Sequence, residues 1–177
     1  MNLMKVEITT KRLLLQAIAM HHKTEIFKEF TVEVSTYMYP RPAIDISETE
    51  QFIEDSTIGL TNGYNLQLVI LKKDTQEFLG CTGIHNINTE TPEFGIWLKK
   101  SAQGQGYGLE TITALKQWAQ ENLDCEYLRY PVDKENYPSR RIPEQLGGVI
   151  VKEYDKRNLS GNVLHLVEYK ILRVGNR

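Results

Sequence analysis

The sequence predicts a mixed α+β fold, with a mixed, mostly antiparallel sheet of about seven strands and helices on both of its faces. Residues 64–98 have the pattern of three strands joined by short turns. A glycine-rich loop over 103–108 is followed by an amphipathic helix and then by another strand over 126–132. The chain closes with two more strand-like segments. Strands therefore outnumber helices, and most of them are joined by turns.

The first sixty residues contain one strand and two helices. Residues 11–17 favour a strand, and residues 19–30 have apolar side chains at helical intervals. Two prolines prevent regular structure over 32–46. Ser47–Glu50 matches a capping box, so we expect a helix to begin there and to run to about Leu60.

The rest of the chain alternates turns with strands and two further helices. We expect strands over 64–72, 78–87, 93–98, 126–132, 149–154 and 163–172, and helices over 109–122 and 138–146. A strand, a helix and a strand in succession predict that the strands 93–98 and 126–132 are parallel neighbours, joined by a right-handed crossover. The strands before this unit are predicted to be antiparallel.

Composition narrows the class of protein. The 177 residues, of which 41% are hydrophobic, suit one domain spanning residues 1–177. A net charge of −2 gives no basic field for nucleic acid. Cys81 and Cys125 are too few for a disulfide framework, and the four histidines show no metal-ligand spacing, so we expect no metal. With no secretion signal and no membrane-length apolar run, we expect a cytoplasmic protein that does not bind a membrane.

The loop Gln103–Gly108 is the most informative segment for function. Its three glycines allow sharp turns and close approach to a ligand, and a helix begins directly after them. The first N–H groups of a helix have no partner within the helix, and the helix dipole adds positive potential there. This arrangement favours a phosphate group. The alternative is a tight turn between a strand and a helix that binds no ligand.

Two familiar phosphate-binding loops do not fit. A Walker A loop has Lys and then Ser or Thr after its last glycine, whereas Leu109 and Glu110 stand here. A dinucleotide fingerprint places a third glycine at position 109 and lies in a βαβ unit with an acid for the ribose. This loop instead follows an antiparallel meander.

A third pattern, Gln/Arg-x-x-Gly-x-Gly/Ala, is met by Gln103, Gly106 and Gly108. It resembles the acyl-CoA-binding loop of the GNAT N-acetyltransferase superfamily. Further segments resemble the RimJ/RimL-like branch of that superfamily, in the same order along the chain: Thr10–Leu15, Glu77–Ile84, Glu93–Leu98, and Asn136–Ser139 followed by Leu146-Gly147.

The resemblance implies an N-acetyltransferase that moves an acetyl group directly from acetyl-CoA to a primary amine. The acceptor would be a protein N-terminal α-amine or a small-molecule amine, and a homodimer is plausible. The strand ends 96–98 and 130–132 would splay apart to admit the pantetheine arm. Acceptor specificity would come from the irregular segment 32–46 and the loop 156–162, because loops on a rigid scaffold commonly carry it.

The resemblance also implies a set of CoA-binding residues. Main-chain groups of Trp97 and Leu98 would pair with the pantetheine amides, and the Asn136 side chain would hydrogen-bond the same arm. Gln103 would flank the loop. The N–H groups that would hold the pyrophosphate belong to Gly104, Gln105, Gly106, Tyr107 and Gly108.

Two residues are candidates for catalysis. Glu93 matches an acidic position of the branch and would remove the amine proton through water; the alternative is a solvated carboxylate at the start of a strand. Ser139 would interact with the thioester sulfur; the alternative is that Ser139 caps a helix. For Asn136, the alternative to CoA binding is a role as a turn or cap residue.

The sequence departs from the family at two positions. Pro143 occupies the position of a tyrosine that acts as general acid in many relatives, and it predicts a kinked or shortened helix that excludes Ile142. Gly148 stands where an aromatic residue is usual. The missing tyrosine leaves a second function open, a catalytically weak acyl-CoA-binding or sensing protein. A third is a nucleotide-binding protein, which would bind ATP or NAD more tightly than CoA.

Overall fold

The computed structural model describes residues 1–174, whose strands form one eight-stranded sheet in the order β1-β2-β3-β4-β5-β6-β8-β7. The strands are β1 (Glu7–Thr9), β2 (Leu13–Ala17), β3 (Asn65–Lys72), β4 (Phe78–His85), β5 (Glu93–Leu98), β6 (Tyr127–Asp133), β7 (Val149–Arg157) and β8 (Val163–Leu172). Only β5 and β6 pair in parallel. The predicted fold class is confirmed, with one strand more than expected because the short β1 was not foreseen.

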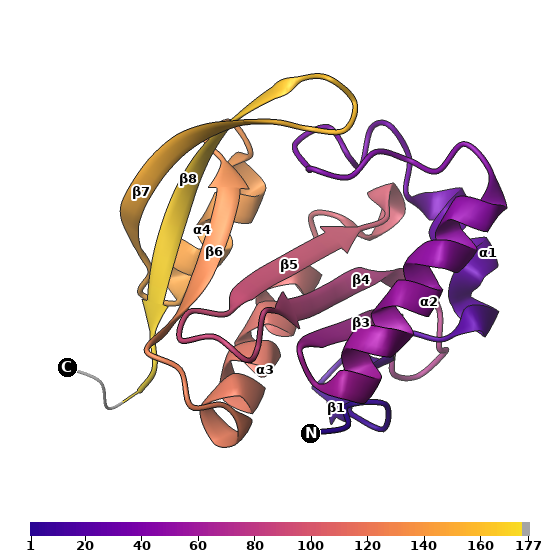
Figure 1. The fold of residues 1–177 in the computed structure, drawn as a ribbon, viewed down its shortest axis with the longest axis horizontal. Helices are drawn as coiled ribbons and strands as arrows, with labels where there is room; N and C mark the ends of the chain where they lie inside the picture. The colour runs from indigo at the N-terminus through magenta and orange to yellow at the C-terminus, as the bar shows by residue number, and fades with distance from the viewer. Residues whose placement is uncertain (175–177) are drawn as a thin grey trace.

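Helices cover both faces of the sheet. They are α1 (Lys23–Glu29), α2 (Ile46–Asn62), α3 (Tyr107–Asn122) and α4 (Tyr137–Gln145), with short 3-10 turns at Met20–His22 and Lys100–Ala102. In Figure 1, α2 lies in front of the sheet at β3 and α1 lies beside α2 at the right edge, whereas α3 and α4 lie behind the sheet. The buried core fills both interfaces and contains, among others, Leu15, Ile53, Leu68, Ile112 and Leu128.

The β5–β6 pair opens into a splay. The two strands are in register at a single pair, Glu93↔Arg129, and separate beyond it. Figure 1 shows β5 and β6 diverging toward the top of the molecule in a V shape. The predicted parallel pairing is thus confirmed, and the strands leave each other where β5 continues to Leu98.

Two irregular segments meet across the open end of this splay. The Leu159 N–H donates to the Tyr39 carbonyl at 2.9 Å. The Asn158 Nδ2 atom donates to the Met38 carbonyl at 3.2 Å, and the Lys156 ammonium lies 4.1 Å from the centre of the Tyr39 ring. Figure 1 shows the β7–β8 turn reaching over toward the segment that precedes α2. Residues far apart in the sequence therefore close the mouth of the splay together.

The start of α2 corrects the predicted capping box. Asp45, not Ser47, is the N-cap, and its Oδ1 atom accepts from the Ser47 N–H at 2.8 Å. Glu48, three residues after this N-cap, occupies the position of the second residue of a capping box. Its carboxylate instead contacts the Nη1 and Nη2 atoms of Arg41 at 3.0 and 3.2 Å. Asp is an equally good N-cap residue, so the cap lies two positions earlier than the sequence pattern indicated.

Helix α4 also differs from the prediction. It includes Ile142 and continues through Pro143 to Gln145. Pro143 lies in the last turn of α4, and its carbonyl accepts from the Gly148 N–H at 2.8 Å, which closes the helix end. A Cβ atom at Gly148 would lie 2.8 Å from that same carbonyl oxygen, which explains why the usual aromatic residue is absent.

His22 makes the stability of this fold depend on pH. Its side chain is 7% exposed, and its Nδ1 atom accepts from the Ala19 N–H at 3.0 Å. Burial, and then the proximity of His21, lower the pKa of His22 from 6.5 to about 4. The neutral ring is therefore the form that fits the folded state.

We expect the free energy of unfolding to fall as the pH drops from 6.5 toward 4, by at most about 3 kcal/mol from this residue. The unfolded chain binds the proton first, so the contribution is complete above pH 6.5 and is lost below it. Urea unfolding at several pH values measures this. His22→Asn keeps an acceptor for the Ala19 N–H and should flatten the pH dependence; an unchanged slope would contradict the assignment.

Candidate active site

The glycine loop presents a row of unpaired N–H groups. Gly104 and Gly106 have φ values of +77° and +80°, and Gly106 is the N-cap of α3. The first helical bond is donated by Glu110 to the Gly106 carbonyl at 3.2 Å. Within residues 1–174, the N–H groups from Gly104 to Leu109 contact no protein acceptor. Such a row at a helix N-terminus fits a pyrophosphate.

Arg12 and Glu110 hold the loop against the start of β2. The Arg12 Nε atom lies 2.8 Å from Glu110 Oε1, its Nη1 atom donates to the Gln105 carbonyl at 3.0 Å, and its guanidinium lies 4.4 Å from the centre of the Tyr107 ring. Thr10 donates to Glu110 Oε2 at 2.6 Å. Burial raises the pKa of Glu110, but the hydrogen bonds from Thr10 and Arg12 outweigh it and the net pKa is lowered. The sequence did not reveal this support.

The other predicted loop residues have distinct places. Gln103 donates from Nε2 to the Leu98 carbonyl at 3.1 Å, which ties the loop to the end of β5. Gln105 is exposed and donates to the Ser101 carbonyl at 3.0 Å. Gly108 is buried against α4, because a Cβ atom there would lie 2.9 Å from Ile142 Cδ1. The loop is thus fixed at both ends before any ligand binds.

The register of β5 corrects the prediction for the Trp97 main chain. Lys99 donates its N–H to the Leu79 carbonyl at 2.8 Å, and Cys81 lies opposite Trp97. Because hydrogen-bonded pairs alternate along antiparallel strands, the N–H and C=O of Trp97 face β4. Those of Ile96 and Leu98 face the splay. The Leu98 carbonyl accepts from Gln103 Nε2, so the free main-chain groups on this side are the N–H and C=O of Ile96 and the N–H of Leu98.

Glu93 lies at the point where the splay opens and belongs to a charged cluster. Arg129 Nη2 lies 3.1 Å from Glu93 Oε2, and Arg129 Nη1 lies 3.0 Å from Glu168 Oε1. Glu168 is 6% exposed and also accepts from the Tyr154 hydroxyl at 3.4 Å. Glu93 is therefore held in place rather than freely solvated. Two carboxylates share one guanidinium, so the cluster carries a net charge of −1.

His85 stands beside Glu93 and was not singled out by the sequence. The two residues are opposite each other in the β4–β5 register. Burial lowers the pKa of His85, although Glu93 acts to raise it. A Cβ atom on Gly95 would lie 2.9 Å from His85 Nε2, so the absence of a side chain at Gly95 gives the imidazole its room. A neutral imidazole thus covers β5 next to the splay.

Ser139 and Asn136 lie on the other side of the splay, at the start of α4. The Ser139 hydroxyl lies 2.7 Å from the hydroxyl of Tyr130, a buried residue of β6. Burial raises the pKa of Tyr130 to about 12, against the opposing effect of Ser139, so the phenol keeps its proton at neutral pH. Asn136 makes no side-chain capping bond. Asn136 is nevertheless the N-cap residue of α4 by position, and its carbonyl accepts from the Arg140 N–H at 3.0 Å.

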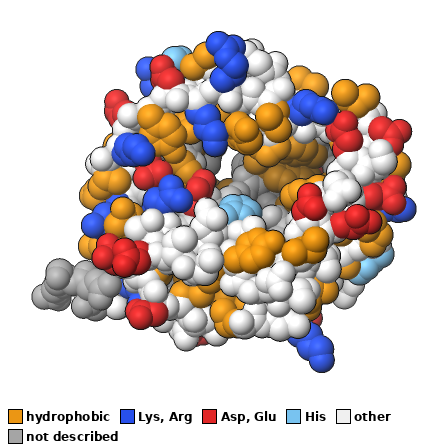
Figure 2. Space-filling view, viewed as in Figure 1, with side chains coloured by type: hydrophobic (Ala, Val, Ile, Leu, Met, Phe, Trp, Pro, Cys, Tyr) orange, Lys and Arg blue, Asp and Glu red, His pale blue; other side chains and the backbone are white. Residues whose placement is uncertain are grey.

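A cavity of about 320 Å³ lies on the front face of β4 and β5. It is bounded by α1, α2, the segment 38–43 and the strand residues Gly95, Ile96 and Trp97. Figure 2 shows a hollow at the centre of this face with hydrophobic side chains along its edge. The pocket therefore meets the splay from the face opposite α3 and α4.

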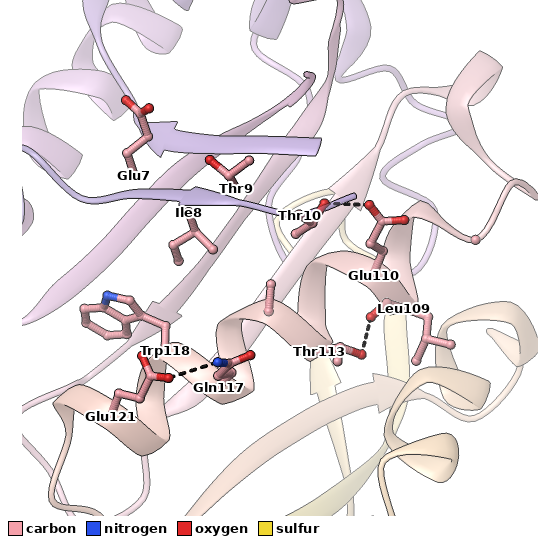
Figure 3. Close-up of a pocket in the computed structure, with 12 residues that line it drawn as sticks. Glu7, Ile8, Thr9, Thr10, Leu109, Glu110, Thr113, Gln117, Trp118 and Glu121 are labelled. Carbon is pink, nitrogen blue, oxygen red and sulfur yellow. Dashed lines mark hydrogen bonds between the residues drawn. The ribbon is translucent and has the colours of Figure 1, made fainter. Parts of the chain in front are cut away.

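A second, wider groove of about 740 Å³ runs between β1 and α3 (Figure 3). Only its Gly106 end touches the phosphate loop. Figure 3 shows Ile8 and Trp118 facing each other across it, and the hydrogen bond from Thr10 to Glu110 near the loop end. Its charged residues are Glu7, Glu110 and Glu121, so it offers no cation to a phosphate group.

The described residues show no arrangement for a metal or a membrane. In residues 1–174, no three His, Cys, Asp or Glu side chains gather as metal ligands would. The helices of the same range are too short or too polar to span a bilayer. Cys81 and Cys125 are free and buried, and burial raises the pKa of both thiols.

Comparison with known proteins identifies the family. Residues 12–149 match the acetyltransferase (GNAT) domain. An N-acetyltransferase from Bacillus licheniformis named p20, itself uncharacterized, is 24% identical over 146 residues, covering 80% of this chain and 81% of p20. Among solved structures, RimL, the ribosomal L7/L12 α-N-protein acetyltransferase in complex with coenzyme A, superposes with a TM-score of 0.83 at 17% identity, covering 94% of this chain and 98% of RimL.

Spermidine N-acetyltransferase from Vibrio cholerae, in complex with CoA and spermine, superposes on this chain with a TM-score of 0.80 at 17% identity. The match covers 93% of this chain and 97% of the spermidine enzyme. The unpaired N–H groups, the splayed strands and the family match lead to one identification. This chain belongs to the GNAT acetyltransferase family and is an acetyl-CoA-dependent acetyltransferase.

Proposed function

We propose that the protein transfers the acetyl group of acetyl-CoA directly to the nitrogen of a primary amine. One observation carries the proposal. Six consecutive unpaired N–H groups, from Gly104 to Leu109, stand beside a strand splay in which both main-chain groups of Ile96 and the N–H of Leu98 are free. The first feature suits a diphosphate and the second an extended arm that carries amides.

The donor-binding residues follow from this geometry. The N–H groups from Gly104 to Gly108 would hold the pyrophosphate, with Gln103 keeping the loop on β5. Ile96 and Leu98 would pair with the pantetheine amides as a neighbouring strand does. The Asn136 side chain, which makes no capping bond, would contact the same arm. Acetyl-CoA supplies an acetyl group activated as a thioester.

Glu93 is proposed as the group that takes the proton from the amine, through a water molecule. Its position is fixed by Arg129, and it lies where the splay opens. The same guanidinium also pairs with Glu168, so one positive charge faces two carboxylates. The cluster therefore keeps a net negative charge, which attracts an ammonium ion to Glu93. Deprotonation is required because only the neutral amine is a nucleophile.

Ser139 is proposed to donate a hydrogen bond or a proton to the departing sulfur. Tyr130 would replace that proton across the 2.7 Å contact between the two hydroxyls. This pair supplies a hydroxyl donor on β6 and α4 in a chain where Pro143 occupies the position of the family tyrosine. Tyr130 suits the role because burial keeps it protonated.

The proposal is tested by mixing the purified chain with acetyl-CoA and a panel of primary amines and peptide N-termini, and by measuring release of the CoA thiol. We expect release that depends on an amine. Ser139→Ala should lower kcat roughly a hundredfold, at the low end of the range of acid–base contributions, while the Kd for CoA stays unchanged. The control Ser101→Ala alters an exposed serine of the 3-10 turn before the loop and should leave kcat unchanged.

Binding of CoA without acetylation of any amine would contradict the transferase proposal and favour the sensing alternative. Tighter binding of ATP or NAD than of CoA would favour the nucleotide-binding alternative. The cytoplasmic location, the homodimer and the lack of nucleic-acid binding stay predictions from the sequence.

A further inference from the structure

The pocket on the front face of β5 has an apolar wall. It is formed mainly by Ile26, Phe27, Phe30, Met38, Phe52 and Trp97. The Phe30 and Trp97 rings lie 4.9 Å apart. Phe27 and Phe52 remain 37% and 41% exposed. Aromatic side chains left open around a hollow are typical of a site that binds an apolar group.

The pocket carries no net charge. Among its lining residues, the charged pair is Arg41 and Glu48, and these neutralise each other through two contacts of 3.0 and 3.2 Å. The Glu48 carboxylate also accepts from the Ile44 N–H at 3.3 Å. His85 also lines the pocket, and burial lowers its pKa, which favours the neutral imidazole. No carboxylate of the lining is left for a second ammonium group.

The polar side chains of the inner wall are occupied as well. Thr82 donates from Oγ1 to the Gly95 carbonyl at 2.8 Å, and Gln67 donates from Nε2 to the Thr82 carbonyl at 3.2 Å. A ligand that needs several hydrogen bonds would therefore have to break existing ones. An apolar ligand would instead remove exposed aromatic surface from water.

Negative charge lies at one edge of the pocket. Glu93 faces His85 across the β4–β5 register, and its cluster with Arg129 and Glu168 has a net charge of −1. In regular alternation, Glu93, Gly95 and Trp97 share one face of β5. A single ammonium at Glu93 would thus direct its substituent past the His85 imidazole, which covers Gly95, and toward Trp97.

Resting on the proposed function, we propose that this pocket is the acceptor site and takes a small primary amine that carries one apolar or aromatic substituent and no second cation. A cavity of about 320 Å³ is at the small end of ligand pockets. The bound ammonium first gives one proton to Glu93 through water. The neutral nitrogen then forms a bond to the acetyl carbon as the carbon–sulfur bond breaks, and it loses a second proton as the sulfur gains one. The products are an N-acetyl amide, the free CoA thiol and the first proton, which Glu93 returns to solvent.

The test compares amines that differ in apolar surface and in charge. The purified chain with acetyl-CoA is given 2-phenylethylamine, ethanolamine or spermidine, and CoA thiol release is measured. We expect kcat/KM for 2-phenylethylamine to exceed the other two values by about tenfold or more, as burial of a phenyl ring allows. A kcat/KM for spermidine or ethanolamine equal to that for 2-phenylethylamine would overturn the proposal.

A pair of variants on one helix locates the effect. Phe52→Glu places an unpaired carboxylate on the pocket wall and should shift the ratio of kcat/KM for 2-phenylethylamine over spermidine downward by at least about tenfold. Ile58→Glu makes a matched change on α2 at a side chain that is 52% exposed and lies outside the pocket. It should leave the ratio unchanged. Equal effects of the two variants would contradict the location.

Binding measurements separate failure of this inference from failure of the proposed function. Calorimetry with 2-phenylethylamine, in the presence of CoA, reports acceptor binding without turnover. Binding that Phe52→Glu weakens supports the pocket even if no amide forms, in which case the transferase proposal alone fails. Turnover of spermidine with no binding of 2-phenylethylamine would overturn the inference and leave the transferase proposal intact.

Discussion

Replacing Gly106 with tryptophan is expected to abolish CoA binding. Gly106 has a φ of +80°, its neighbours in the loop carry the unpaired N–H groups, and a Cβ atom there would lie 3.4 Å from an Arg12 nitrogen. An indole at this position would cover the donors and disturb the contact of Arg12 with the loop. We expect the Kd for CoA to rise by roughly a hundredfold or more in calorimetry, because main-chain donors supply most of the diphosphate contacts.

The control for this variant is Gly161→Trp. Gly161 has a φ of +88° and open space around its Cβ position, but it lies in the turn between β7 and β8. The same backbone strain is thereby introduced away from the loop. Equal loss of affinity in both variants would mean that strain is responsible. Retained affinity in Gly106→Trp would contradict the assignment of the diphosphate to this loop.

Replacing Glu93 with glutamine is expected to lower kcat by roughly 10²- to 10⁴-fold while the Kd for CoA stays unchanged. Glutamine has nearly the same shape as glutamate but cannot take a proton or hold the negative charge. Arg129 would keep its contact with Glu168 at 3.0 Å, so the base of the splay should remain folded. Single-turnover kinetics with saturating acetyl-CoA separate this effect from binding.

A matched acid and a neighbouring imidazole complete that experiment. Glu77→Gln removes a carboxylate that pairs with Lys72 at 3.3 Å on the turn between β3 and β4, and it should leave kcat unchanged. His85→Gln tests the other group at the same corner. If kcat falls with His85→Gln and not with Glu93→Gln, the proton goes to the imidazole and the role proposed for Glu93 is wrong.

Local patterns sufficed for most elements of the fold. Strand β5 has the predicted bounds, Glu93–Leu98, because a turn precedes it and a short 3-10 turn and the glycine loop follow it. Strand β1 was missed because it has only three residues and depends on pairing with β2. The cap of α2 was misplaced because Asp45 and Ser47 are both good capping residues, and tertiary contacts of Glu48 and Arg41 favour the first.

The functional residues divide in the same way. The glycine loop was predictable because the positive φ angles and the helix start are consequences of the residues themselves. The position of the free main-chain groups was not, since one residue of register decides whether Trp97 or its neighbours face the splay. Arg129 was missed because its partners Glu93 and Glu168 lie 36 and 39 residues away.

The sequence by itself determined the fold class, the phosphate loop and the family, because turn chemistry, hydrophobic periodicity and glycine placement act over a few residues. Only the tertiary structure decided which charges are neutralised around the acceptor pocket. It also paired Ser139 with Tyr130 and placed a neutral His85 beside Glu93. Those outcomes depend on strand register and on the desolvation of particular side chains, which are fixed only when distant segments pack together.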